Sequence, residues 1–425
     1  MPIFDQGYQH WRGALSGHAW RWLAIARHGV RVQMKNRILR LLLLVAWLPA
    51  LLLIAAVAVW GLVEQRSEGA LALVRSFLPA DILLDPRAYR GALWTIAYSF
   101  FFKIQMFCIM LLVVVAGPGL ISRDLRFNAL PLYFSRPLTR LDYLLGKLGV
   151  IGALVAAVAV GPAVFAYVVG VCFSLDVGVV RDTYPVLLAS VAYGLTVTLS
   201  VGSLMLALSS LTRRSLYVGI AWAGIWIISG SVGSIMSEVH RESARRGRYE
   251  GELARWVQEN PPPPGARMRG AFPVLDGRPG SPRPQLAGVA ADHAAEAEKW
   301  FNAWSRQSQQ VQERAAEAEA EMLRGDWRPL CSYVANLERM ADFFLDTRSA
   351  WVTVGKAVAV PQKVMGAAFG PRGGRRPGPP VDENSLANQF VAQSPWEWSA
   401  GVLAGLLGLS TWTLFRRVKS LDRLK

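Results

Sequence analysis

Six long apolar runs constrain the fold of this 425-residue chain more than any other feature. A helix of about 20 apolar residues crosses the ~30 Å hydrocarbon core of a bilayer. A segment in lipid must satisfy its backbone hydrogen bonds internally, which favours helices. The sequence therefore predicts an all-α polytopic membrane protein. Its six predicted transmembrane helices cover residues 38–62, 93–121, 144–173, 186–211, 216–235 and 396–415.

Two of these spans contain residues that are unusual in a lipid-facing helix. Lys103 lies inside the second span, where a charge at bilayer depth is costly. We expect its side chain to extend to the membrane interface, and a position facing a transported substrate is the alternative. Gly161 and Pro162 lie in the middle of the third span and predict a kink there.

The N-terminal segment is basic and contains tryptophans. Trp20 and Trp22 alternate with arginines such as Arg21 and Arg27. This composition predicts an amphipathic helix in the membrane interface over residues 1–37, and an unstructured basic leader is the alternative. No cleavable signal peptide is predicted, because the first apolar run is long enough to stay in the bilayer.

About 160 residues of different character separate the fifth and sixth spans. Residues 240–260 and 290–324 are predicted to be helical, the second as one arm of a helical hairpin, and residues 326–346 are amphipathic. The proline-rich stretches PPPPG and PRGGRRPGPP read as linkers. Residues 349–370 are too polar for a good span, so we expect an external or partly re-entrant element.

The charges are distributed unevenly between the two sides of the membrane. Six spans place both termini on one side, together with residues 122–147 and 212–215. The segments on that side hold 19 Lys and Arg against 4 Asp and Glu, whereas the rest of the chain holds 27 against 26. The positive-inside rule makes this side cytoplasmic. We therefore expect a multi-pass protein of the cell (inner) membrane whose termini are cytoplasmic and whose basic residues meet membrane lipid. No nucleic-acid partner is expected.

No catalytic constellation is visible. Gly146-Lys147 lacks the earlier glycine that a phosphate-binding loop needs, and Gly355-Lys356 fails in the same way. No HExxH motif or paired-cysteine metal spacing occurs, and the five histidines are scattered. We expect no catalytic residue, no metal site and no enzyme activity, so that any active transport must be powered by another protein.

The polar loop at residues 122–147, between the second and third spans, is unusually rich in large apolar residues. Ser122 can cap a short helix with Asp124 in its first turn, and Pro131 would limit that helix. Thr139 with Asp142 three residues later predicts a capping box at the start of the third span. A positive-inside anchor needs only a few basic residues. The apolar residues and prolines therefore favour docking of a partner, and a simple anchor is the alternative.

This loop resembles a known family. It is similar to the loop between the second and third spans of type-2 ABC transporter permeases, which commonly read close to D-x-x-x-x-A-L-P-L-Y-x-S-R-P-x-x-R-x-x-Y-x-x-G-K. Weaker similarities occur at residues 211–222, at residues 334–342 and in the basic ending RRVKSLDRLK. The insertion between residues 237 and 325 is longer than the family usually has. The matching positions in the loop are Asp124, Ala129 to Tyr133, Ser135 to Pro137, Arg140, Tyr143, Gly146 and Lys147.

The resemblance implies the membrane subunit of an ATP-driven exporter. Such a permease forms the membrane pathway as a homodimer or heterodimer and couples to ABC ATP-binding subunits. ATP and Mg would be bound by those partners, and no cofactor by this chain. A second cytoplasmic turn would contribute Arg213 and Arg214. The ATPase-coupling interface would comprise Arg123, Asp124, Leu125, Arg126, Phe127, Leu130, Leu132, Tyr133, Arg136, Pro137 and Arg140.

Four regions are therefore predicted along the chain. Residues 1–37 form the cytoplasmic interfacial helix, and residues 38–235 form spans one to five with the coupling loop at 122–143. Residues 236–395 form a largely helical extracytoplasmic insertion, and residues 396–425 form the sixth span and a basic cytoplasmic tail. The substrate is not predicted. An alternative function is a membrane scaffold that presents the insertion to envelope partners.

Overall fold

The computed structural model describes residues 20–135, 138–174, 176–262, 267–269, 283–285, 294–368 and 384–418. Among these residues, six helical segments are long and apolar enough to cross a membrane. Each overlaps one predicted span, so the predicted all-α polytopic membrane fold is confirmed. The segments are Arg37–Glu64, Arg90–Arg126, Arg140–Ser174, Gly178–Leu211, Ser215–Arg241 and Trp396–Arg417.

The chain divides into two compact units. The membrane unit comprises Met1–Ile227, Leu337–Ala350 and Ser399–Lys425, and the insertion unit comprises Ile228–Asn336 and Trp351–Trp398. Four helices contribute residues to both units: α12 (Ser215–Glu259), α14 (Tyr333–Leu345), α15 (Thr347–Ala368) and α17 (Trp396–Arg417). Segment 337–350, which lies in the insertion by sequence, thus belongs to the membrane unit.

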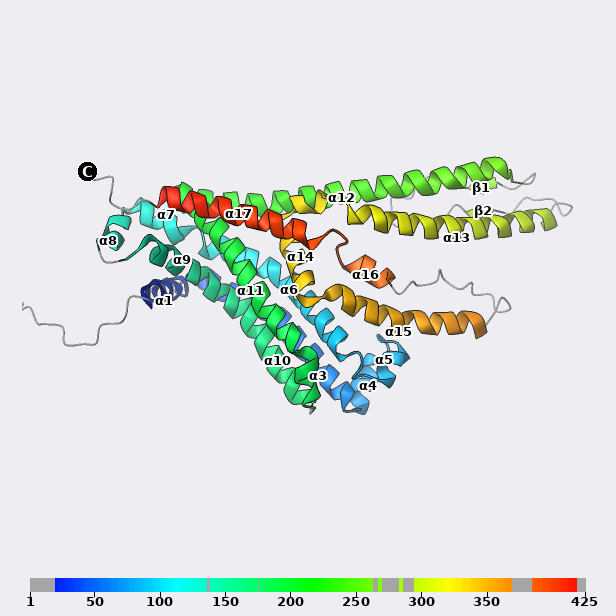
Figure 1. Ribbon diagram of the computed structural model, residues 1–425, viewed down its shortest axis with the longest axis horizontal. Coiled ribbons are helices and arrows are strands. Elements are labelled where there is room, and N and C mark those ends of the chain that lie inside the picture. The colour runs from blue at the N-terminus through cyan, green and yellow to red at the C-terminus, as the bar shows by residue number, and fades with distance from the viewer. Residues whose placement is uncertain are drawn as a thin grey trace, which may run out of the picture. The chain divides into compact units, whose positions relative to one another are not determined.

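The membrane unit is a bundle of long helices with short helices at both ends (Figure 1). We call the end with α7, α8 and the start of α9 the loop end, and the opposite end, with α4 and α5, the Arg90 end. The helices before α12 are α1 (Arg21–Gln33), α2 (Arg37–Val45), α3 (Leu48–Glu64), α4 (Glu68–Val74), α5 (Ala80–Leu84), α6 (Arg90–Ala116), α7 (Gly119–Arg126), α8 (Leu130–Phe134), α9 (Arg140–Val155), η2 (Ala156–Val160), α10 (Gly161–Ser174) and α11 (Gly178–Leu211).

Small residues let the long helices approach one another closely. Gly61 of α3 lies against the backbone of Phe173 in α10, where an added Cβ would lie only 2.8 Å from the carbonyl carbon. Gly170 of α10 faces Trp94 of α6, whose ring would be 2.5 Å from such a Cβ. Larger residues at these two glycines would force α3, α6 and α10 apart.

The third span contains a π-helical turn next to the position where a kink was predicted. The five residues Ala156–Val160 form a π-helical turn, η2, directly before Gly161 and Pro162. Proline has no N–H to donate to the preceding turn, so the helix widens locally instead of keeping its i→i−4 ladder.

A buried arginine joins the helices at the Arg90 end. Only 1% of the Arg90 side chain is exposed. Its guanidinium donates to both carboxylate oxygens of Glu64, at 2.7 and 2.8 Å, and to Asp176 and Asp182 at 3.0 Å each. The Ser174 hydroxyl also donates to Glu64. This network connects the end of α3, the start of α6 and the turn that leads into α11.

The turn before α11 is shaped by the same network. Asp176 accepts the backbone N–H of Gly178 at 3.0 Å and an N–H of Arg90. These two hydrogen bonds, the backbone one first, hold the pKa of the Asp176 carboxyl below its usual value. The acid is therefore charged at neutral pH, as the ion pair with Arg90 requires.

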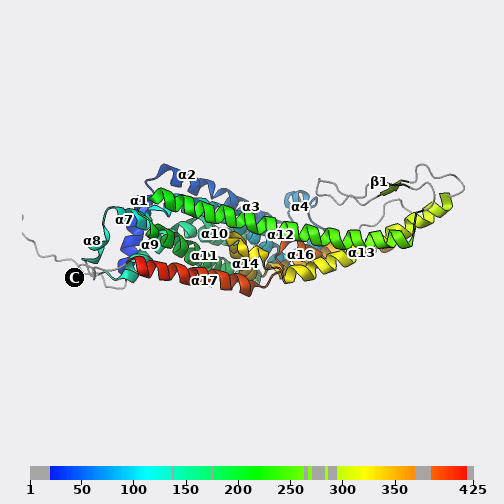
Figure 2. The ribbon, with the colours of Figure 1, turned by 90° about the horizontal axis from the view of Figure 1, so that it is seen from above.

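The insertion unit contains a pair of long antiparallel helices. The outer part of α12 runs beside α13 (Ala294–Arg324) in both ribbon views (Figures 1 and 2). The rings of Trp256 and Trp300 meet across this pair at a tilt of 45° with centroids 5.8 Å apart, and Trp300 Nε1 donates to the carbonyl of Asn260. The helical hairpin arm predicted from residues 290–324 is thus present.

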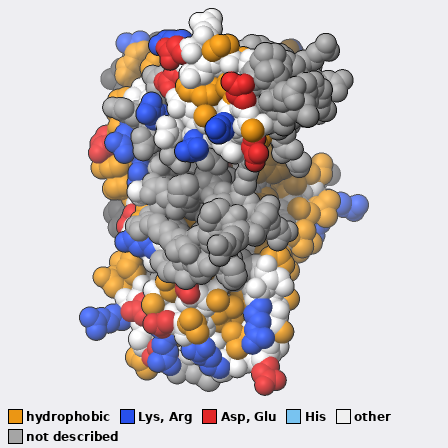
Figure 3. All heavy atoms as spheres, turned by 90° about the vertical axis from the view of Figure 1, so that its right-hand side faces the viewer, with side chains coloured by type: hydrophobic (Ala, Val, Ile, Leu, Met, Phe, Trp, Pro, Cys, Tyr) orange, Lys and Arg blue, Asp and Glu red, His pale blue; other side chains and the backbone are white. Residues whose placement is uncertain are grey.

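The remaining elements of the insertion are short helices and one small ladder. Strands β1 (Arg267–Arg269) and β2 (Arg283–Gln285) pair antiparallel, with Met268 opposite Pro284. Residues 349–368 of the moderately apolar stretch belong to α15, which is not among the six candidate spans of the described chain, and residues 369–370 lie outside the described residues. Figure 3, which looks at the right-hand side of Figure 1, shows both acidic and basic side chains among apolar ones on that face. The other elements are η4 (Arg328–Cys331), α14 (Tyr333–Leu345), α15 (Thr347–Ala368) and α16 (Ser385–Phe390).

The Arg90 network predicts an asymmetric mutational response. Arg90→Met would leave the Glu64 carboxylate, 2% exposed, buried and unpaired. We expect a loss of about 3–5 kcal/mol in stability, partly recovered by adding Glu64→Gln. The exposed Arg87→Met control should change stability by less than about 0.5 kcal/mol. Thermal unfolding in nanodiscs, followed by tryptophan fluorescence, measures all three, and equal midpoints for the two arginine variants would contradict the prediction.

Candidate functional site

The loop between the second and third spans is fixed to α11 at its first turn. The helix breaks at Gly117 and Pro118, between α6 and α7. The Ser209 hydroxyl of α11 accepts the backbone N–H groups of Ile121 and Ser122, at 3.1 and 3.0 Å, and donates to the Pro118 carbonyl at 2.8 Å. Ser209 thus supplies, from another helix, the cap that the start of α7 needs.

The sequence-based prediction that Ser122 caps this helix is wrong. Ser122 lies inside α7, is fully buried, and donates its hydroxyl to Pro118. Asp124 is accordingly in the last turn of α7 and not in the first. Helix α7 ends at Arg126, the following Asn128 has a left-handed φ of 50°, and the Ala129 N–H donates to the Asp124 carbonyl at 2.8 Å. This is a Schellman-type end, in which asparagine tolerates the left-handed position.

Asp124 joins the loop to the third span. One of its carboxylate oxygens accepts the Tyr143 hydroxyl and the Lys147 ammonium, both at 2.7 Å. The Asp124 side chain is 16% exposed and that of Lys147 is 12% exposed, so water competes little for the ion pair. Because Tyr143 and Lys147 are four residues apart on α9, they lie on one face of that helix.

Aromatic rings cover this ion pair. The ammonium of Lys147 lies 5.4 Å from the Tyr143 ring centroid and 5.8 Å from that of Tyr133 in α8. The two tyrosine rings are 5.3 Å apart. Burial and the nearby Asp124 charge raise the pKa of Tyr133. Asp124, Tyr133, Tyr143 and Lys147 therefore form one unit, the loop-end cluster, which holds α7, α8 and α9 together.

The capping box predicted at the third span is confirmed. The Thr139 side chain accepts the Asp142 N–H at 3.1 Å, and the Asp142 carboxylate accepts the Thr139 N–H at 3.0 Å. The box starts α9 directly after the loop, so the direction of the chain into the third span is fixed locally.

The other predicted interface residues separate by exposure. Phe127 and Leu132 are 72% and 73% exposed, although both are large and apolar. Arg126 lies over the Phe127 ring at 5.5 Å. Arg136 and Pro137 lie outside the described residues. Among the rest, Arg123 is exposed, and the half-buried residues are Leu125, Leu130 and Arg140.

The second predicted turn lies at the loop end as well. Arg213 and Arg214 are exposed between α11 and α12. Arg214 donates to the Tyr217 hydroxyl at 3.3 Å and lies 5.8 Å from its ring centroid. The described part of the predicted coupling loop and the turn at Arg213 and Arg214 thus lie at the same end of the membrane unit (Figure 1).

Helix α1 packs against the same end of the third span. Gly146 and Gly149 of α9 face α1, and a Cβ on Gly146 would lie 2.6 Å from the Cβ of Ile25. The Gln33 side chain donates to the carbonyl of Ala116 at the end of α6, at 2.9 Å. Gly146, which the family pattern places beside Lys147, therefore makes room for the N-terminal helix. Residues 1–19 lie outside the described chain.

A comparison with protein families identifies the family of this chain. The family described as ABC-2 family transporter protein matches residues 23–246, which is more than half of the 425 residues. The chain belongs to this ABC-2 transporter family. It is a permease, the membrane component of an ABC transporter, and its family implies a partner ABC ATP-binding subunit. No curated protein and no solved structure matched the chain.

The permease has a second polar cluster that sequence reasoning missed. Lys103 was predicted to extend to the interface, but its ammonium lies 3.9 Å from Asp342 in α14. Asp342 also accepts hydrogen bonds from Thr347, at 2.9 Å, and from Ser99. The contact fastens α14 to the second span. Only the charge of Lys103 inside an apolar run could have signalled it from sequence.

The cluster around Lys103 is sensitive to protonation. Burial raises the pKa of Asp342, and the charge of Lys103 with the hydrogen bond from Thr347 offsets this in part. Burial also raises the pKa of Glu338, one turn earlier in α14. A raised carboxyl pKa means that the folded protein favours the protonated acid. The protonated acids therefore stabilise the folded protein at pH values below the ordinary carboxyl pKa. This contribution is lost as the pH rises through the raised pKa of the folded protein.

Within the described residues, no group of three or more His, Cys, Asp or Glu side chains could hold a metal ion. The three cysteines are free thiols. The polar clusters described above pair acids with Lys or Arg, an arrangement that positions helices.

The loop-end cluster predicts the effect of removing its acid. Asp124→Ala would leave the Lys147 ammonium and the Tyr143 hydroxyl without their shared acceptor. We expect a stability loss of about 1–3 kcal/mol and faster amide exchange over residues 119–134. Hydrogen–deuterium exchange of the purified permease measures this, with the exposed Glu68→Gln as the control. Unchanged exchange in the loop would contradict the assigned role of Asp124.

The Lys103 cluster predicts a pH-dependent effect. Lys103→Met should cost about 2 kcal/mol at neutral pH, because the buried Asp342 loses its counter-charge while Lys103 itself is part-exposed. The cost should fall at mildly acidic pH, where Asp342 takes up a proton. Adding Asp342→Asn should restore most of the loss at neutral pH. Thermal unfolding in nanodiscs at both pH values tests this, and a loss that is equal at both would refute it.

Proposed function

We propose that this permease is the membrane subunit of an exporter and that its 122–143 loop couples it to the partner ATP-binding subunit. The observation that carries the proposal is the exposure of Phe127 and Leu132, 72% and 73%, at the tip of the loop. These two large apolar side chains lie outside the candidate spans and beside exposed arginines, so a partner protein can cover them where acyl chains do not. Arg126 and Arg123 beside them offer charge for orientation.

Contacts of the loop with three spans can transmit a displacement of the loop to the bundle. The loop-end cluster joins α7 and α8 to the third span, Ser209 joins α7 to the fourth span, and α7 follows directly on the second span. A displacement of Phe127 therefore reaches three spans through short polar contacts. Packed helices of this kind move largely as rigid bodies between discrete arrangements.

The charge distribution supports a cytoplasmic position for the loop end. Arg123, Arg126, Arg213 and Arg214 are exposed there, and α17 ends at the same side with two arginines in its last turn. On this proposal the protein is a multi-pass protein of the cell (inner) membrane, and both termini are cytoplasmic.

The mechanism we propose is a shift between inward-open and outward-open populations. ATP and Mg would be bound by the partner subunits, and this chain would contribute no ATPase activity. Closure of two ATP-binding subunits would favour one separation of the loops in a dimer of permeases, and the spans would follow. A ligand shifts such an equilibrium only by the difference between its affinities for the two states. Here that ligand is the nucleotide bound by the partner subunits.

Coupling predicts that a charge on the exposed apolar tip separates the two subunits. Phe127→Asp with Leu132→Asp should reduce co-purification of the ATP-binding subunit at least tenfold, because each carboxylate would be desolvated in the interface. The control is Leu84→Asp, an apolar position of similar exposure (70%) at the Arg90 end, which should leave the complex intact. The measurement is quantitative pull-down from detergent with ATPase activity of the eluate.

Two further outcomes separate this proposal from its alternatives. ATP-dependent accumulation of substrate in inside-out vesicles supports export, and the opposite direction would refute it. If loop variants change nothing while loss of residues 241–325 abolishes the phenotype, the chain is instead a scaffold for envelope partners.

A further inference from the structure

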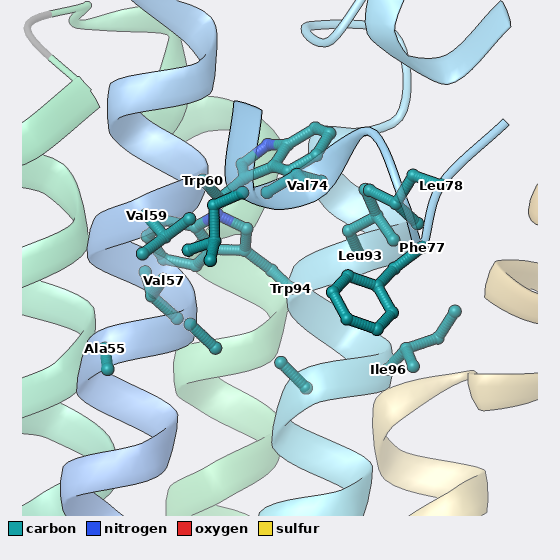
Figure 4. A pocket seen from close by; sticks show the side chains of 13 residues that line it. Ala55, Val57, Val59, Trp60, Val74, Phe77, Leu78, Leu93, Trp94 and Ile96 are labelled. Atoms are coloured by element: carbon teal, nitrogen blue, oxygen red, sulfur yellow. The ribbon is translucent and has the colours of Figure 1, made fainter. Parts of the chain in front are cut away.

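An apolar groove lies between α3, α4 and α6 at the Arg90 end of the membrane unit (Figure 4). Its volume is about 530 Å³, within the range of roughly 300–1,000 Å³ that is usual for ligand sites. No charged side chain lines it. The lining consists of Ala55, Ala56, Val57, Val59, Trp60, Leu73, Val74, Phe77, Leu78, Leu93, Trp94, Ile96 and Ala97.

The groove continues the lipid-facing surface of α3. Leu48 and Leu52 of this helix are 58% and 69% exposed, as expected of side chains that meet acyl chains. The next turn carries Ala55 and Ala56, which are also exposed but much smaller. The hollow therefore begins where leucine gives way to alanine on one helix face, and hydrocarbon from the bilayer can enter it without crossing polar surface.

Two buried indoles in the wall lack hydrogen-bond acceptors. Trp60 and Trp94 are 6% and 2% exposed, and neither Nε1–H has an acceptor in the structure. Figure 4 shows both side chains among those that line the groove. Buried tryptophan N–H groups normally find a partner. Trp94 is held in place by Gly170 and by an edge contact with Tyr167, at 5.7 Å, so it cannot turn elsewhere for an acceptor.

The position of the indoles limits what the acceptor can be. Trp60 is one helical turn from Glu64, and Trp94 is one turn from Arg90, the buried ion pair that marks the polar end of these spans. Tryptophan at such a level lies at the membrane interface, where one side of the ring is apolar and the other meets polar groups. In a glycerophospholipid the ester carbonyls lie at this level, directly above the acyl chains.

We propose that the groove binds one ester-linked acyl chain of a bilayer glycerophospholipid, whose carbonyl oxygen accepts from Trp60 and Trp94. Phe77, 82% exposed at the rim, would lie along the chain. The groove is a resident lipid site of the permease, and it does not depend on the coupling proposed above. It predicts a preference for ester-linked lipid, because an ether linkage offers no carbonyl.

The first test is covalent mapping. Nanodiscs of phosphatidylcholine would contain a small fraction of the same lipid with a diazirine in its acyl chain, and crosslinked peptides would be identified by mass spectrometry. We expect adducts concentrated on residues 55–60 and 73–78. Ala56→Leu, which fills the groove, should reduce them at least fivefold, and the exposed Ala153→Leu on α9 should not. Adducts spread evenly over the lipid-facing spans would overturn the proposal.

The second test concerns the carbonyl. Native mass spectrometry would compare retention of ester-linked and ether-linked phosphatidylcholine. We expect about a fivefold preference for the ester lipid, which is what one net hydrogen bond supplies. Trp60→Phe should reduce this preference and a further Trp94→Phe should abolish it, whereas the exposed Trp412→Phe should keep it. Equal retention of the two lipids by the unmodified permease would refute the assigned acceptor.

The third test separates a resident lipid from transported cargo. Crosslinking would be repeated in native membrane vesicles with and without ATP and Mg. A resident lipid predicts the same adduct yield in both. Loss of the groove adduct during turnover would overturn the proposal in favour of a lipid-like cargo, whatever the outcome of the coupling experiment.

Discussion

A bilayer offers no water to satisfy polar groups, and the structure of this permease depends on meeting that constraint within the chain. Hydroxyls in the fourth span return to their own helix, as when Ser190 donates to Val186 and Thr198 to Gly194. Trp222 of α12 donates to the carbonyl of Met110 in α6. Arg90, Lys103 and Lys147, three charges in or beside the spans, are likewise paired with acids from other segments.

Two such pairings fix the two ends of the bundle. At the Arg90 end, Arg90 donates hydrogen bonds to three acids. At the loop end, Asp124 accepts from Lys147 and Tyr143. The arrangements are complementary, because a bidentate guanidinium can connect several helices, while a carboxylate oxygen can accept from two donors on one helix face. Polar networks therefore join the helices at both ends of the bundle, and glycine contacts, apolar packing and the Lys103–Asp342 pair act between them.

The spans were predictable from sequence because their signal is local and long. The capping box was also predictable, since Thr139 and Asp142 are three residues apart. The Arg90 network was not, because its partners lie 26, 86 and 92 residues away. The partner of Lys103, Asp342, lies far along the chain in α14, within the insertion by sequence. For the loop, the family pattern gave Asp124 and Tyr133, but the Schellman end at Asn128 depends on backbone geometry that no motif expresses.

The π-helical turn in the third span has a geometric consequence. It inserts one residue relative to a regular helix, and one residue corresponds to a rotation of about 100°. The face of α9 that carries Tyr143 and Lys147 is thereby set independently of the face of α10 that carries Gly170. In an uninterrupted helix, orienting Tyr143 and Lys147 toward the loop would rotate Gly170 away from its helix contact. The extra residue in Ala156–Val160 lets one span serve the loop and the α3 contact together.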